Sequence, residues 1–163
     1  MRAIVLSDYF HNIYSDFGED GILFCLFRLI GHFNNPTYLN ICTHFPRNNG
    51  ILNLVKMFSF KNSTNTRVET TIDHMKGIQL ASPRLDLLRV TLCDGVEYWL
   101  VKALIERGVR PSVICCDINL FERSLSVPYV PPIKRKEVLD ANYRGASIAA
   151  FRSFLGKHGY VYV

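Results

Sequence analysis

The sequence lacks the patterns that mark metal-binding, disulfide-rich or membrane-spanning proteins. Its five cysteines have no CxxC spacing, and no pair of its five histidines has the spacing of metal ligands. It contains no glycine-rich phosphate loop, and no apolar run is long enough to cross a bilayer. We therefore expect free thiols in a reducing, cytoplasmic setting, with no metal and no membrane contact.

The composition is that of a globular chain. With 163 residues and 48% hydrophobic residues, residues 1–163 are expected to form a single domain with a substantial core. Nineteen basic residues against fourteen acidic ones give a net charge of only +5. The densest basic cluster, Lys134–Lys136, is typical of a solvated loop; a phosphate or nucleic-acid contact is the alternative. A nucleic-acid partner is not favoured, because no stripe of alternating basic and aromatic residues accompanies the cluster.

The centre of the chain predicts a strand, a helix and a second strand. Leu87–Leu92 and Val113–Ile118 are apolar without alternation, as in strands covered on both faces. Between them, Glu97–Arg107 has apolar residues at helical spacing; Gly108 stops that helix and Pro111 prevents it from resuming. Such a unit places the two strands side by side and parallel.

The flanking elements extend this pattern to an α/β fold with a mostly parallel sheet. Helices are expected over residues 20–32, 50–60 and 145–158, and strands over residues 38–42 and 160–163. Residues 61–66 are expected to form a loop, and residues 68–75 are ambiguous. The first helix is expected to bury Ile22, Leu26, Leu29, Ile30 and Phe33. The predicted core of the central unit is Leu88, Val90, Leu92, Leu104, Val113, Ile114 and Ile118.

Polar residues follow both central strands, where a parallel sheet presents its ligand crevice. Asp94 and Gly95 follow the first strand, and Asp117 and Asn119 end the second. Either aspartate could act as a general base, and Asn119 could contact a substrate. The alternatives are a simple turn leading into the helix at Asp94 and Gly95, and a strand end that only meets solvent at Asp117 and Asn119.

Five segments, in the same order, resemble methyltransferase-like proteins related to the FkbM type. Residues 14–23 (YSDFGEDGIL) are similar to "SQFGEDGI", and residues 85–99 (LDLLRVTLCDGVEYW) to "DLLSIDIDGNDYW". Residues 113–119, 128–132 and 143–150 resemble the family's "VVVIEYN", "PY.P" and "YFGASLAAL" pieces. The resemblance implies a shortened Rossmann-like sandwich of the class I methyltransferase type, with S-adenosylmethionine as cofactor. Its implied activity is methyl transfer to a small-molecule or sugar hydroxyl.

The resemblance also implies roles for individual residues. It places Glu19, Asn40, Cys42 and Gly95 beside the cofactor. It places Asn119, Tyr143 and Ser147 beside the substrate, and Asp94 and Asp117 at the reacting group. For Glu19 the alternative is an ordinary acid in a first helical turn, and for Ser147 it is a helix cap.

The departures from the family pattern concern the cofactor site. Asn40 stands where the family has an acid, and Cys42 where it has the glycine that lets the backbone approach the cofactor. No Asp or Glu occurs from Thr43 to Val68 to bind the ribose. The segment between the first strand and the central unit is too short for both usual intervening strands. Thr91 replaces the first aspartate of the central turn. Two functions follow: a methyltransferase-like domain with a decayed cofactor pocket, or a non-catalytic binding or assembly module on the same fold.

Overall fold

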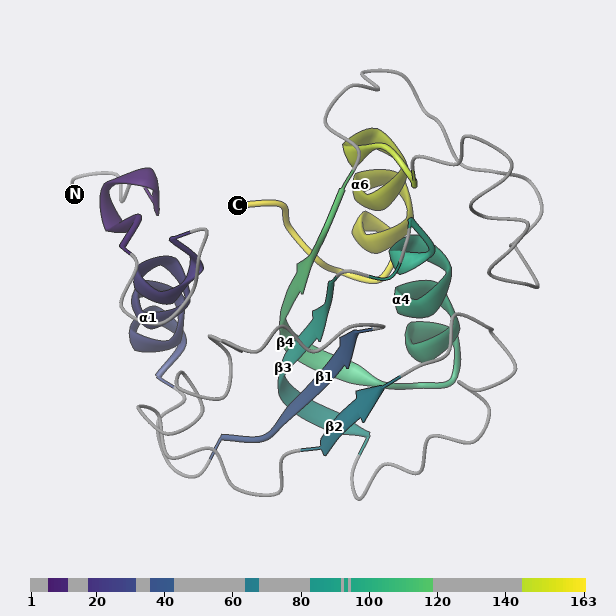
Figure 1. Ribbon diagram of the computed structural model, residues 1–163, viewed down its shortest axis with the longest axis horizontal. Coiled ribbons are helices and arrows are strands. Elements are labelled where there is room, and N and C mark those ends of the chain that lie inside the picture. Colours follow the sequence, from purple (N-terminus) through teal and green to yellow (C-terminus); the bar gives the residue numbers. More distant parts are fainter. Residues whose placement is uncertain are drawn as a thin grey trace.

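A computed structural model describes residues 6–11, 18–31, 36–42, 64–67, 83–91, 93, 95–118 and 145–163. Figure 1 shows a sheet with α1 on one side and α4 and α6 on the other. The helical elements are η1 (Leu6–Tyr9), α1 (Glu19–Ile30), α4 (Glu97–Glu106) and α6 (Ile148–Gly156). The strands are β1 (Tyr38–Cys42), β2 (Thr64–Arg67), β3 (Arg84–Val90) and β4 (Arg110–Cys116).

The described sheet has four parallel strands in the order β2-β1-β3-β4. The predicted parallel pairing of the central strands is confirmed, with Leu87 opposite Val113 and Leu88 opposite Ile114. From β1 the chain first adds β2 on one side and then places β3 on the other side. The order therefore reverses between β1 and β3, which makes the carboxyl ends of these two strands a topological switch point.

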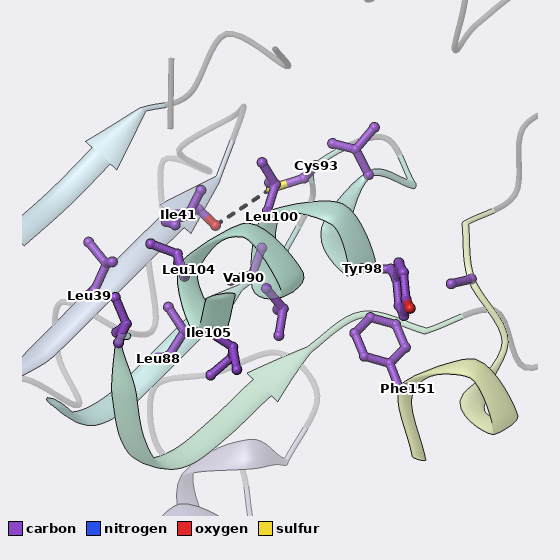
Figure 2. Close-up of a cluster of buried hydrophobic side chains, with 14 of the residues drawn as sticks. Leu39, Ile41, Leu88, Val90, Cys93, Tyr98, Leu100, Leu104, Ile105 and Phe151 are labelled. Atoms are coloured by element: carbon purple, nitrogen blue, oxygen red, sulfur yellow. Dashed lines mark hydrogen bonds between the residues drawn. The ribbon is translucent and has the colours of Figure 1, made fainter. Parts of the chain in front are cut away.

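The larger hydrophobic core lies between the sheet and helices α4 and α6 (Figure 2). Leu88 and Val90 on β3 pack there with Leu104 on α4, and all three are fully buried, as predicted. Tyr98 on α4 meets Phe151 on α6 edge to face, with ring centroids 5.3 Å apart. This contact joins the two helices on one face of the sheet and is worth more than its buried area alone.

The prediction that β4 is fully buried is wrong. Val113, Ile114 and Ile118 are only partly buried, because β4 is the outermost strand of the described sheet. Leu92 lies outside the described residues. A continuous apolar run therefore indicates a strand, but does not distinguish a central strand from an outer one.

Helix α1 covers the other face of the sheet through a smaller cluster. Its buried apolar side chains are Leu23, Cys25 and Phe27. Leu23 and Phe27, one helical turn apart, pack with Tyr38 and Leu87. The predicted buried face is therefore wrong: Leu29 is 54% exposed. Ile30 is also exposed, while Ile22 and Leu26 are partly buried; Phe33 is not described. The helix is apolar around most of its circumference, so hydrophobic spacing alone did not determine which side meets the sheet.

Three other predicted elements differ or lie outside the described residues. The loop expected over residues 61–66 contains the start of β2, a polar strand that pairs with β1. Residues 160–163 form no strand, and Val161–Val163 are exposed. The expected helix at 50–60, the ambiguous segment at 68–75 and the basic cluster Lys134–Lys136 are outside the described residues. No described helix has the length and apolar character needed to span a bilayer.

Candidate functional site

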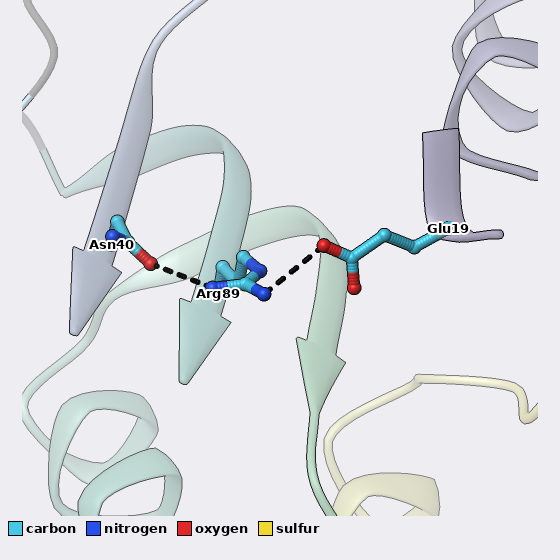
Figure 3. A network of polar contacts seen from close by, with 3 residues as sticks. All are labelled: Glu19, Asn40 and Arg89. Atoms are coloured by element: carbon cyan, nitrogen blue, oxygen red, sulfur yellow. Dashed lines mark hydrogen bonds and ion pairs between the residues drawn. The ribbon is translucent and has the colours of Figure 1, made fainter. Parts of the chain in front are cut away.

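A polar network lies on the α1 face of the sheet, close to the switch point (Figure 3). Arg89 on β3 donates from Nη2 to Glu19 Oε1 at 3.0 Å and from Nη1 to Asn40 Oδ1 at 3.4 Å. The side chains of Arg89 and Glu19 are only 14% and 18% exposed, and Asn40 is fully buried. The structure thus brings together two residues that the resemblance assigns to the cofactor, Glu19 and Asn40, and joins both to an arginine.

Two donors near this network have no hydrogen-bond partner within the described part of the chain. They are the Arg89 Nε–H and the Thr91 hydroxyl, and Thr91 is only 3% exposed. Thr91 directly follows β3, two residues after Arg89. Buried donors normally have a partner, so this arrangement is incomplete as it stands.

The carboxyl ends of β1 and β3 are held together by close contacts. The Thr91 backbone N–H donates to Ile41 O at 3.1 Å. The Cys93 thiol is fully buried and lies 3.3 Å from Thr91 O and 3.7 Å from Ile41 O (Figure 2). Cys42, at the end of β1, is 2% exposed. The position where the family needs a glycine therefore carries a buried side chain.

The turn after β3 is organised by Glu97, a residue that the sequence analysis did not select. Its carboxylate accepts a hydrogen bond from the Cys93 backbone N–H at 2.8 Å and is nearly fully buried. Burial raises the pKa of Glu97 above its usual value of 4.5, although backbone hydrogen bonds within the turn oppose the shift and Asp117 adds to it. An acid in the first turn of a helix that follows a strand end was the signal available in the sequence.

Gly95 lies in this turn with a left-handed φ of 89°. Gly145, just before α6, approaches it so closely that a Cβ on Gly145 would lie 3.3 Å from Gly95 Cα and Gly95 O. Glycine is therefore required at Gly145 both by its φ of 77° and by the neighbouring backbone. Gly95 is thus placed in a backbone contact between two turns.

Asp117 and Ser147 are the other predicted site residues that the structure describes. Asp117 is exposed at the end of β4, and its backbone N–H donates to Val90 O at 3.3 Å. Ser147 is fully buried and caps α6, its hydroxyl accepting from the Ala150 backbone N–H at 3.2 Å, so the capping alternative is confirmed. Asp94, Asn119 and Tyr143 lie outside the described residues.

The cysteines near the site are not arranged for nucleophilic chemistry. All five are free thiols. Desolvation raises the pKa of Cys115 to about 12, and it also raises the pKa of Cys116. Both thiols therefore stay protonated near neutral pH, and a protonated thiol is a poor nucleophile and metal ligand. Within the described ranges, no three His, Cys, Asp or Glu side chains are grouped to bind a metal.

These residues do not fit S-adenosylmethionine in the way that the resemblance implies. The Asn40 amide oxygen accepts from Arg89, and the buried Cys42 side chain stands where the resemblance implies a glycine. Strand β2 ends at Arg67 and not at an acid that could bind a ribose. No family model, curated protein or solved structure matches this chain.

Proposed function

We propose that this chain is a methyltransferase-like domain whose adenosyl site is closed by its own side chains, and that it acts as a non-catalytic binding or assembly module. The observation that carries the proposal is the Glu19–Arg89–Asn40 network. Two residues that would serve the cofactor are instead engaged by a buried arginine.

Two further observations support this proposal. Cys42 is buried at the end of β1, where the family has a glycine, and the buried Cys93 thiol lies against the backbone of β1 and β3. A fold is determined by its core and connections, so it can persist after its site has changed. The parallel sheet with a switch point between β1 and β3 is retained.

The test is calorimetric titration of the protein with S-adenosylmethionine and with its demethylated product. We expect no binding of either ligand at micromolar concentration. An unchanged thermal unfolding midpoint in the presence of either ligand would give an independent readout, because any ligand that binds the native state raises this midpoint. Binding at micromolar ligand would overturn the proposal.

Micromolar binding would favour the second function, methyl transfer to a small-molecule or sugar hydroxyl. Asp117 supports that alternative, since it is exposed at the carboxyl edge of the sheet and its charge raises the pKa of the nearby Glu97. Asp94 or Asp117 would then be the base, with Asn119 and Tyr143 beside the substrate. Transfer of a labelled methyl group to a panel of sugar hydroxyls, lost in Asp117→Asn, would establish it.

A further inference from the structure

We propose that Arg89 is the recognition group of a binding site for a small-molecule carboxylate, and that the Glu19 carboxylate, in the first turn of α1, occupies this site at rest. The site lies at the carboxyl end of β3, on the α1 face of the sheet. It deepens the binding role proposed above by naming the class of ligand.

The geometry of the ion pair is the first argument. A carboxylate binds a guanidinium best side-on, with its two oxygens accepting from two neighbouring N–H groups. Glu19 contacts only Nη2, at 3.0 Å, and the adjacent Nε–H is buried without a partner among the described residues. A free carboxylate, not constrained by a helix backbone, could accept from Nε and Nη2 together.

A second donor extends the site. The Thr91 hydroxyl is buried and unpartnered in the described part of the chain, and Thr91 directly follows β3, two residues after Arg89. The switch point, where an open α/β sheet receives its ligand, is formed by the ends of β1 and β3. An anion with several oxygens would satisfy donors that Glu19 leaves unpaired.

Glu19 can leave Arg89 without movement of the helix. Leu23 and Phe27 hold α1 on the sheet, whereas Glu19 lies in the first turn of α1 and its side chain is 18% exposed. Rotation of the Glu19 side chain toward solvent would free the Arg89 guanidinium. Glu19 therefore acts as an internal competitor for the ligand.

The test compares wild type with Glu19→Gln in titrations with sodium acetate and sodium citrate, against sodium chloride at equal ionic strength. Glu19→Gln removes the internal competitor, so we expect it to bind the carboxylate probes at least roughly tenfold more tightly, equivalent to about 1.4 kcal/mol. Glu106→Gln, an exposed acid on α4, is the matched control and should bind as wild type does. Equal affinity of Glu19→Gln and wild type, or no binding by either, would overturn the proposal.

Two variants test the donors directly. Arg89→Lys keeps the charge but loses the two neighbouring N–H groups that bind a carboxylate side-on. Combined with Glu19→Gln, it should abolish the increase in carboxylate affinity. Thr91→Val removes one hydroxyl with little change in shape, and should weaken binding severalfold; it keeps the test decisive if Arg89→Lys does not fold. Unchanged binding in both variants would show that the carboxylate binds to a different part of the protein, and would refute the proposed site.

S-adenosylmethionine also carries a carboxylate, so free methionine is the reference ligand that separates the two proposals. Binding of S-adenosylmethionine no tighter than that of methionine would belong to the Arg89 site, whereas binding at least roughly tenfold tighter would refute the closed adenosyl site. The acetate and citrate titrations alone decide the Arg89 site.

Discussion

Arg89 and Glu19 are seventy residues apart in the chain and form an ion pair of 3.0 Å between the central sheet and the first turn of α1. An arginine on a strand with neighbours on both sides is expensive to bury, so its partners matter more than its own packing. The pair contributes little net stability. Removing one partner nevertheless destabilises the protein, because the other charge then stays buried without a counter-ion.

Arg89→Met should destabilise the protein by about 3 kcal/mol, because it leaves the Glu19 carboxylate and the Asn40 amide without their donor in a mostly buried setting. Urea denaturation at neutral pH measures the effect. Glu106→Gln, which breaks the exposed Lys102–Glu106 pair, is the control and should change stability by less than about 0.5 kcal/mol. A loss no larger than this at Arg89 would show that the ion pair does not persist in solution.

Leu88→Ala and Leu104→Ala should each cost roughly 2–5 kcal/mol, since both side chains are fully buried in the core between the sheet and α4. Leu29→Ala on α1 is a control with the same chemistry at a side chain that is 54% exposed, and should be nearly neutral. Chemical denaturation of the three variants compares them. Similar values for all three would contradict the packing of β3 against α4.

Glu97→Gln should change the pH dependence of stability. Burial raises the pKa of Glu97 in the folded protein above 4.5, so the folded state holds this proton more tightly than the unfolded state. Its contribution to stability is therefore greatest below pH 4.5 and falls as the pH rises through the raised pKa. Wild type should lose stability relative to Glu97→Gln over that range, whereas the Glu106→Gln variant should follow wild type. Parallel stability curves for wild type and Glu97→Gln would show that the carboxyl is hydrated.

Gly145→Ala should be more damaging than Gly159→Ala. Both glycines have a left-handed φ, which costs alanine about 1–2 kcal/mol. Gly159 has open space around its missing Cβ, while at Gly145 the new methyl would press on the Gly95 backbone at 3.3 Å. We expect roughly 1–3 kcal/mol of additional destabilisation at Gly145. Thermal unfolding of the two variants measures the difference, and equal midpoints would contradict the contact between the two turns.

The sequence by itself determined the central βαβ unit and the strand at 38–42. The signals that predict these elements, namely apolar runs, helical spacing and a glycine stop, depend only on residues that are close together in the sequence. The same reasoning gave a helix cap as the alternative to a substrate role for Ser147, because capping depends on the residues that immediately follow, and the structure shows the cap. It also indicated Asn40 and Cys42 as departures from the cofactor pattern of the family that the chain resembles.

Only the tertiary structure decided that β4 is outermost in the described sheet, that polar residues 64–67 form a strand, and which side of α1 meets the sheet. Each of these depends on what the segment packs against, and a backbone ladder can form a strand without an apolar pattern. The junction of Glu19, Arg89 and Asn40 was decided in the same way. Coulombic attraction and desolvation act through space, so the partners of a buried charge are determined by the fold and not by neighbours in the chain.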